Sequence, residues 1–258
     1  MKSSLKIAAL LGTLTLIASI DSQIQVQAFQ PNTTQNRAVE LVNQGQAHAR
    51  EGNFTGAILA YTQAIQTNPH YTDAYIHRGL AYHDLGDYPQ AISNFEQAVQ
   101  IDPDNARAIY NRGEVRSDMG DLQGALADLT EAVRLNPNYA EAYNNRGVLH
   151  AGMGNLQAAI TDLDRAIESN ADYADAYYNR GKAHTALGNA EVAIADFTQA
   201  IRLNPNLAEA YGNRGVLYAE TGNKQAALAD LQRAAALFQQ SNDQLSYEQT
   251  LLYIEQLQ

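Results

Sequence analysis

The chain repeats itself with a period of 34 residues. The tripeptide Asn-Arg-Gly begins at Asn111 and returns at Asn145, Asn179 and Asn213. Alignment of the chain on this tripeptide gives six blocks of equal length, at residues 38–71, 72–105, 106–139, 140–173, 174–207 and 208–241. Coincidence cannot explain such regularity, so the block is the unit from which the fold is built.

Four positions of the block hold a small residue in all six copies: glycine at positions 8 and 15, and alanine at positions 20 and 27. Small residues at positions 8, 20 and 27 let two antiparallel helices approach closely, and a larger residue at position 24 fills the space beside them. Glycine at position 15 can adopt the left-handed conformation that ends a helix, and the Asn or Asp after it can cap the next helix. Each block is therefore predicted to be a helix, a tight turn and a second helix.

The second helix of a block is predicted to stop at position 31. Four blocks carry Asn-Pro or Asp-Pro at positions 31 and 32, and a proline disfavours the helical conformation in the residue before it. In the fourth block, Asn170 at position 31 is followed by Ala171 instead of proline. A softer stop is expected there.

The period, together with Tyr at position 4, Phe or Leu at position 24 and Pro at position 32, resembles the tetratricopeptide repeat family over residues 38–241. The resemblance implies an all-α solenoid, a right-handed superhelix of helix-turn-helix units, whose first helices line a concave surface that holds peptides or partner proteins. Residues 242–258 place Tyr247, Leu251 and Ile254 on one helical stripe. They are expected to form a C-terminal capping helix over the last repeat.

The N-terminus differs in kind from the repeats. Lys2 and Lys6 precede an uncharged apolar run at residues 7–20, and Val-Gln-Ala at residues 26–28 offers a cleavage site. Residues 1–28 are therefore predicted to be a signal peptide and residues 29–37 a linker, so that the mature chain is periplasmic, lumenal or secreted. If cleavage does not occur, residues 7–20 anchor the chain to the inner membrane, although the run is shorter than the roughly 20 residues that span a bilayer.

The charge and composition of the chain limit the classes of partner and activity that we expect. The formal net charge is -11; Lys2, Lys6 and Asp21 fall in the signal segment, which leaves 15 basic and 27 acidic residues. Nucleic acid is not an expected partner, because affinity for phosphate backbones comes from clustered Lys and Arg. Cysteine is absent, and no phosphate loop, nucleophile elbow, metalloprotease helix or carboxylate pair stands out. We expect no enzyme activity, no cofactor and no metal site.

Position 7 is more often leucine in the family, but five blocks carry arginine there. A charge at a helix-packing position needs a partner, and position 23 supplies aspartates. The predicted structural pairs are Arg112 with Asp128, Arg146 with Asp162, Arg180 with Asp196 and Arg214 with Asp230. The alternative is a ladder of arginines for an anionic ligand.

Position 6 carries asparagine in five blocks, at Asn43, Asn111, Asn145, Asn179 and Asn213. The series is similar to an asparagine ladder of this family whose amides bind the main chain of an extended peptide, and a primary amide offers both a donor and an acceptor for that task. The resemblance also places positions 2, 5, 9, 12 and 13 on the groove, including Tyr110 and Tyr178 at position 5. The alternative is that these amides bond neighbouring helices.

The sequence thus predicts a non-catalytic, exported scaffold that binds an extended peptide or protein segment on its concave surface, in the assembly of an envelope or lumenal complex. The repeats are similar to those of exported bacterial, notably cyanobacterial, members of the family. Two alternatives stay open: a self-associating structural array, and a regulatory subunit of a secretion or envelope complex.

Overall fold

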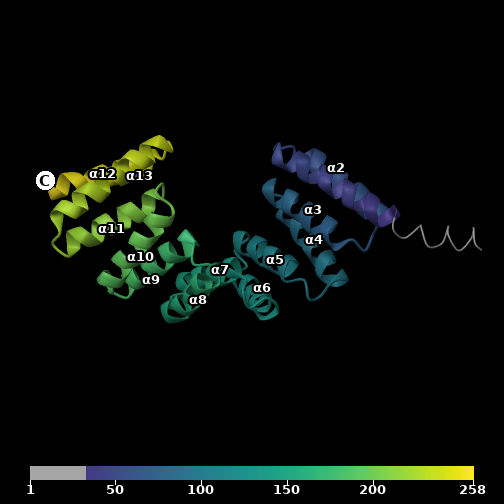
Figure 1. Ribbon diagram of the computed structural model, residues 1–258, viewed down its shortest axis with the longest axis horizontal. Coiled ribbons are helices and arrows are strands. Elements are labelled where there is room, and N and C mark those ends of the chain that lie inside the picture. The colour runs from purple at the N-terminus through teal and green to yellow at the C-terminus, as the bar shows by residue number, and fades with distance from the viewer. Residues whose placement is uncertain (1–32) are drawn as a thin grey trace, which may run out of the picture. The chain divides into compact units, whose positions relative to one another are not determined.

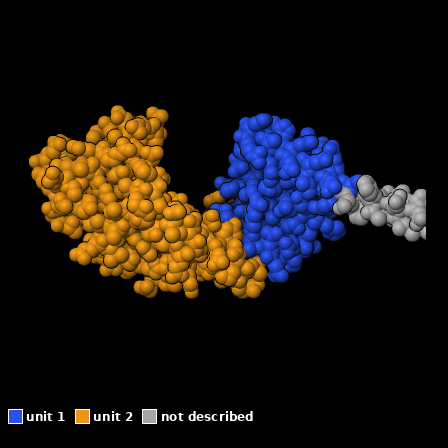
Figure 2. All heavy atoms as spheres, in the orientation of Figure 1, with its two compact units in different colours: residues 1–115 blue, residues 116–258 orange. Residues whose placement is uncertain are grey.

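The computed structural model describes residues 33–258, and this part of the chain consists of helices joined by short turns, without a strand (Figure 1). Residues 1–32, which hold the predicted signal peptide and part of the predicted linker, lie outside the described residues. No helix within residues 33–258 is long and apolar enough to cross a membrane. The chain divides into two compact units, residues 1–115 and 116–258, which are described separately (Figure 2).

The helices follow one another in pairs. Residues 33–50 are helical, and the helices after them are α2 (Phe54–Thr67), α3 (Thr72–Asp84), α4 (Tyr88–Ile101), α5 (Ala106–Asp118), α6 (Leu122–Leu135), α7 (Ala140–Gly152), α8 (Leu156–Ser169), α9 (Ala174–Ala186), α10 (Ala190–Leu203), α11 (Ala208–Glu220), α12 (Lys224–Gln240) and α13 (Gln244–Leu257). The helix at residues 33–50 and helices α3, α5, α7, α9 and α11 are the first helices of the six blocks. The all-α fold predicted from the sequence is confirmed.

The start of the first helix corrects the predicted linker. Residues 33–37 are helical and run directly into the first block. Arg37 donates to Glu40 one turn later at 3.0 Å, and Gln35 accepts a hydrogen bond from Asn68 just after α2. These contacts accompany an extension of the helix beyond the stretch that the repeat pattern marks.

The glycines at position 15 end the first helices as predicted. All six have positive φ, from 72° at Gly52 to 84° at Gly222, a conformation that costs other residues steric strain. The residue that follows caps the second helix in four blocks, where its side chain accepts from the backbone N–H three residues later: Asn53, Asp87, Asp121 and Asn223. Asn155 and Asn189 stand at the same position without such a hydrogen bond.

The prediction of a softer stop after α8 is wrong. Helix α8 ends at Ser169, and Asn170 takes nearly the same extended conformation (φ -145°, ψ 96°) as Asn68 after α2 (φ -138°, ψ 96°). Asn170 Oδ1 accepts from the backbone N–H of Asp172 at 3.1 Å, and Asn68 makes the equivalent bond with His70 at 3.1 Å. The asparagine side chain, competing locally for backbone donors, is therefore sufficient to end the helix without proline.

Helix α13 packs on α12 and covers the last repeat. Its buried residues are Thr250 and Ile254, and Ile254 lies in a cluster with Leu231 and Ala235 of α12. Leu251, which was expected on the covered stripe, is 41% exposed. The prediction is wrong for this residue, because the helix is rotated so that the polar Thr250 faces inward and satisfies its hydroxyl on Ser246 O at 2.7 Å.

The glycine at position 8 leaves room for the large residue at position 24. Phe197 of α10 is fully buried between Ala193 and Ala200, and its ring lies directly over Gly181 of α9. A Cβ atom at Gly181 would come within 2.8 Å of Phe197 Cε1. The two helices of the repeat can approach this closely only because the first helix has no side chain there.

The variant Gly181→Ala is expected to lower the free energy of unfolding by about 1–3 kcal/mol, since the added methyl forces the buried ring to shift. A matched control is Gly212→Ala in α11, where the nearest heavy atom to an added Cβ is 4.0 Å away. That change is expected to raise stability by up to about 1 kcal/mol through helix propensity alone. Thermal unfolding followed by circular dichroism measures both, and equal shifts would contradict the packing argument.

Candidate binding surface

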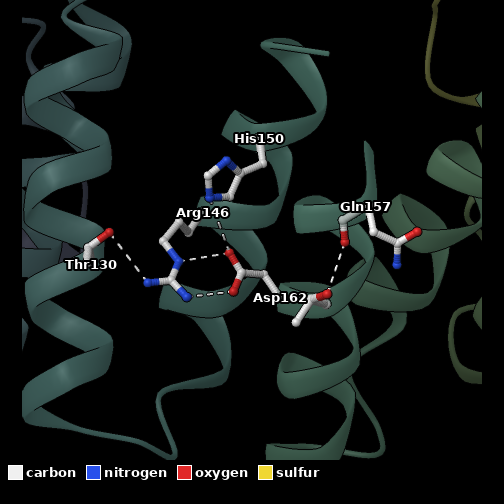
Figure 3. A network of polar contacts seen from close by, with 6 residues as sticks. Thr130, Arg146, His150, Gln157 and Asp162 are labelled. Atoms are coloured by element: carbon white, nitrogen blue, oxygen red, sulfur yellow. Dashed lines mark hydrogen bonds and ion pairs between the residues drawn. The ribbon is translucent and has the colours of Figure 1, made fainter. Parts of the chain in front are cut away.

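The arginine at position 7 is held by two repeats. Arg146 donates from Nε to Asp162 Oδ2 at 2.8 Å and from Nη2 to Asp162 Oδ1 at 2.6 Å (Figure 3). Its remaining arm, Nη1, lies 3.4 Å from Thr130 Oγ1 of the preceding block (Figure 3), and its guanidinium carbon lies 5.6 Å from the ring centroid of Tyr143. The buried aspartate and the half-buried arginine thus form a two-pronged ion pair that also ties adjacent repeats together.

The same arrangement recurs along unit 2. Arg180 donates to both oxygens of Asp196, at 3.0 and 2.6 Å, and to Asp164 of the preceding block at 2.6 Å. Arg214 donates to both oxygens of Asp230, at 2.7 and 2.8 Å, and to Thr198 at 2.9 Å. In each case the two partners lie 16 residues before and 16 residues after the arginine. The sequence analysis missed the earlier partner, although the symmetrical spacing was a signal that could have revealed it.

In unit 1, the position-7 arginine of the second block, Arg78, has neutral hydrogen-bond partners. Arg78 donates from Nε to Asn94 Oδ1 at 2.7 Å and from Nη1 to Thr62 Oγ1 at 3.1 Å. Burial lowers the pKa of Arg78, with the rings of Tyr82 and Tyr75 acting against that effect. The arginine is therefore accommodated by hydrogen bonds where no aspartate stands at position 23.

The carboxylate of Asp128 has an arginine partner that was not predicted from the sequence. Asp128, buried in α6, accepts from Arg116 Nη1 at 2.7 Å. Arg116 stands at position 11, where other blocks carry His or Tyr. Arg112 lies half-buried on α5 in unit 1. A second arginine on the same helix was thus a candidate partner that the block alignment did not single out.

The carboxylates keep these guanidinium groups strongly charged. Hydrogen bonding to Asp162 raises the pKa of Arg146 against the opposing effect of burial, and hydrogen bonding to Asp230 does the same for Arg214. Burial alone would lower the pKa of Arg180, but hydrogen bonds to Asp196 and Asp164 outweigh it and raise the pKa. Because their donors point at protein oxygens, these arginines are poorly placed to form a ladder for an anionic ligand.

The asparagines at position 6 also connect repeats. Asn179 Nδ2 donates to Asn144 Oδ1 at 3.0 Å, and Asn213 Nδ2 donates to the Tyr178 hydroxyl at 3.3 Å. Both acceptors stand at position 5 of the preceding block. In the part of the chain that the structure describes, no donor reaches Oδ1 of Asn179 or of Asn213. Each amide therefore uses one of its two N–H donors internally and keeps its oxygen as an acceptor.

The other predicted ladder residues lie in varied surroundings. Asn145 accepts from Asn144 Nδ2 at 3.1 Å, and Asn43 is exposed on the first helix. Asn111 is buried in α5, and its Nδ2 has no hydrogen-bond partner among residues 33–258. Tyr110 is half-buried on the same helix. The structure therefore brings the ladder residues into similar helical positions but gives them different hydrogen bonds.

The second block has histidine at position 6. His77 Nε2 lies 2.9 Å from Gln46 Nε2 of the preceding block, and its ring stacks on Tyr61 with centroids 5.7 Å apart. Burial lowers the pKa of His77, and the charge of Arg107 lowers it further against the pull of Asp73. The histidine thus also links two repeats, but to position 9 of the preceding block rather than to position 5.

Three pockets open between successive first helices. A pocket of about 350 Å³ lies between α7 and α9 and includes Asn179; we call it the α9 pocket. A pocket of about 330 Å³ is bounded by α9, α11, α12 and α13 and includes Asn213; we call it the α11 pocket. In unit 1 a pocket of about 300 Å³ lies between the first helix and α3 and includes His77. Every one of the three therefore contains a position-6 side chain.

The pockets are lined by equivalent positions of the blocks. Positions 6, 9 and 13 contribute Asn179, Lys182 and Ala186 to the α9 pocket, and Asn213, Val216 and Glu220 to the α11 pocket. Residues with these spacings share one side of a helix. We call this side of α9 and α11, defined by these six residues, the ladder face. It presents polar amides beside hollows that could receive side chains of a partner.

Pairs of short helices that stack through equivalent positions define an α-solenoid, a class of protein that offers an extended face rather than a single enclosed site. A family model described as TPR repeat matches residues 45–86, 79–120 and 116–154, and one described as tetratricopeptide repeat matches residues 149–208 and 178–242. The chain belongs to the tetratricopeptide repeat family. Members are non-catalytic interaction scaffolds, so the predicted interaction role and the absence of enzyme activity are confirmed at the level of the family.

Solved structures with this fold include MamA, which is 29% identical, with a TM-score of 0.58 over 67% of this chain and 94% of MamA. YrrB, described as a TPR protein with an unusual peptide-binding site, is 23% identical, with a TM-score of 0.58 over 74% of this chain and 96% of YrrB. PilW, described as a widely conserved type IV pilus biogenesis factor, is 20% identical, with a TM-score of 0.72 over 83% of this chain and 98% of PilW. No curated protein matches the chain significantly.

Proposed function

We propose that the chain is an exported scaffold that binds an extended peptide or protein segment along the ladder face, and that this binding serves the assembly of an envelope or lumenal complex. The observation that carries the proposal is the placement of Asn179 and Asn213: each lines a pocket and retains an amide oxygen to which no described residue donates. An acceptor of this kind binds a peptide N–H whatever the side chain attached to it.

The spacing of the repeats suits an extended chain. Packed helices lie about 8–10 Å apart, and three residues of an extended peptide span about 10 Å. One asparagine per repeat can therefore meet every third peptide unit, while intervening side chains enter the pockets. Each hydrogen bond contributes about 0.5–1.5 kcal/mol, so much of the affinity must come from the pockets.

Export and domain organisation belong to the same proposal. In this proposal residues 1–28 are a signal peptide, the six blocks are the repeats and residues 242–258 are the cap. Cleavage of the signal peptide gives a mature periplasmic, lumenal or secreted protein. Without cleavage, residues 7–20 would instead anchor the protein to the inner membrane. The peptide-binding site named for YrrB and the pilus biogenesis role named for PilW lend support by analogy. Those roles are known for the two relatives themselves.

The double variant Asn179→Ala, Asn213→Ala is expected to bind a selected peptide about 5- to 160-fold more weakly than the original chain, which corresponds to the loss of two hydrogen bonds worth about 1–3 kcal/mol together. The peptide is obtained by selecting from a displayed library of random dodecapeptides on the full chain, and its affinity is measured by fluorescence anisotropy. A matched control is Asn155→Ala, which removes an exposed amide that caps no helix by its side chain and should leave the affinity unchanged.

Unchanged affinity in the double variant, with peptides still selected, would remove the ladder from the proposal. Selection of no peptide, together with a scattering mass that grows with protein concentration, would overturn the proposed function in favour of a self-associating array.

A further inference from the structure

The α11 pocket has an apolar floor. Leu217 of α11 and Leu231 and Phe238 of α12 line it, and all three side chains are buried. Val216 and Tyr253 add apolar surface on α11 and α13. The inner end of a side chain that enters this pocket therefore contacts hydrocarbon.

The rim of the α11 pocket is acidic. Glu209 and Glu220 both line it and both are exposed. They stand eleven residues apart on α11, which places them on the same side of the helix and about 16 Å from each other along its axis. No lysine or arginine is among the described residues that line this pocket. Glu209 also raises the pKa of Tyr178, although burial of the phenol is the larger cause.

The neighbouring α9 pocket has a basic lining residue instead of acidic ones. Its walls include Val148, Leu156 and Leu163, its one charged lining residue in the described chain is Lys182, and no acid lines it. Lys182 Nζ lies 5.4 Å from the ring centroid of Tyr178, so a cation already rests on an aromatic ring that also faces the α11 pocket. The sign of the charge thus reverses between two adjacent pockets of the ladder face.

We propose that the α11 pocket receives a lysine or arginine side chain of the bound segment, with the aliphatic stem against Leu217 and Phe238 and the cationic head at Glu209 or Glu220. Long basic side chains bury their methylene groups on apolar surface while their charge stays near water. The α9 pocket receives an apolar side chain of the same segment. The proposal rests on the proposed function and specifies its ligand: an apolar and a basic residue about three positions apart in an extended chain.

Arginine suits the α11 pocket better than lysine does. The flat guanidinium stacks on aromatic rings and forms paired hydrogen bonds with carboxylates, and the pocket offers the ring of Tyr253 and the two glutamates. An acidic side chain would meet two like charges in a protein whose net charge is already -11. Electrostatic complementarity therefore selects the basic residue and excludes the acidic one.

The test uses two probes that differ only in charge, N-acetyl-arginine amide and N-acetyl-citrulline amide, added to the isotopically labelled full chain. The amide signal of Gly212, which lines the pocket, reports binding by nuclear magnetic resonance. Arginine amide is expected to bind about five- to tenfold more tightly than citrulline amide. The variant Glu209→Gln, Glu220→Gln should abolish this difference, whereas Glu141→Gln, which removes an acid from the same repeat position on α7, should preserve it.

Equal binding of the two probes, or no shift with either, would overturn the proposal. The peptides selected in the experiment on the proposed function provide an independent test of the basic subsite. Their sequences are expected to contain an excess of Lys or Arg about three residues from an apolar residue. Selected peptides without that excess would overturn the basic subsite and leave peptide binding intact. Selection of no peptides would overturn both.

Discussion

Replacement of Asp162 by leucine is expected to lower the free energy of unfolding by about 3–5 kcal/mol, because it leaves Arg146 without its carboxylate in a half-buried position. The side chains are only 18% (Arg146) and 7% (Asp162) exposed, so water cannot replace the lost partner fully. Arg146→Leu should destabilise for the same reason, by leaving the aspartate unpaired. The double variant should recover much of the loss, since leucine is the residue that this family more often places at position 7.

A double-mutant cycle on the two leucine variants, measured by chemical denaturation, is expected to give a coupling energy of at least about 2 kcal/mol. A matched control is the pair Arg134 and Glu131, which has the same two-pronged geometry at 2.7 and 2.6 Å but side chains that are 63% and 43% exposed. Its coupling should be about 0.2–1 kcal/mol. If the buried pair gave no more coupling than the exposed one, the arginines would not be structural.

The local features of the fold could be predicted from the sequence because single residues decide them. Gly52 and its equivalents adopt positive φ wherever a first helix must end, and a glycine is needed at position 8 wherever a ring or a leucine lies over it. The stop after α8 was mispredicted for an equally local reason. The proline was taken as the signal, whereas the asparagine side chain at Asn170 makes the turn.

The contacts between blocks were harder to predict, because each depends on how one repeat is stacked on the next. Arg180 reaches Asp164 of the preceding block as well as Asp196 of its own, and Arg214 reaches Thr198 of the preceding block as well as Asp230 of its own. A comparison restricted to equivalent positions within a block does not show such pairs. The same holds for the candidate site. The resemblance to the family predicts that Asn213 is near the groove, but the amide atom that remains available depends on the hydrogen bond to Tyr178 in the preceding block.

Part of the α11 pocket lies outside the repeat pattern. Phe238 lies in the extended last turns of α12, and Tyr253 lies on α13, which has no counterpart in the other blocks. The packing of a terminal helix depends on the shape of the surface that it covers on the last repeat, and that shape is not part of the 34-residue pattern. The effect of α13 on the stability of the protein and on the α11 pocket can therefore be measured by altering this helix.

Deletion of residues 243–258, which removes α13, is expected to destabilise unit 2 by at least about 4 kcal/mol. The deletion abolishes the burial of Ile254 and uncovers Leu231 and Ala235, and a large buried aliphatic side chain contributes about 1.5–3 kcal/mol. In a repeat array each unit is stabilised mainly by its neighbours, so the loss should be greatest in α11 and α12. Hydrogen exchange is expected to show faster exchange in those helices, with a smaller change in α7 and α8.

Because the shortened chain could aggregate, Ile254→Ala provides a milder test in the full-length protein, with an expected loss of about 2–5 kcal/mol. Leu251→Ala removes a similar side chain from the same helix at a position that is 41% exposed, and it should cost less than about 1 kcal/mol. Equal effects of the two substitutions would show that α13 does not cover the last repeat. In the hydrogen-exchange experiment on the deletion variant, a uniform loss of protection across unit 2 would mean that its repeats unfold as one cooperative body. The nearest-neighbour description would then fail for this chain.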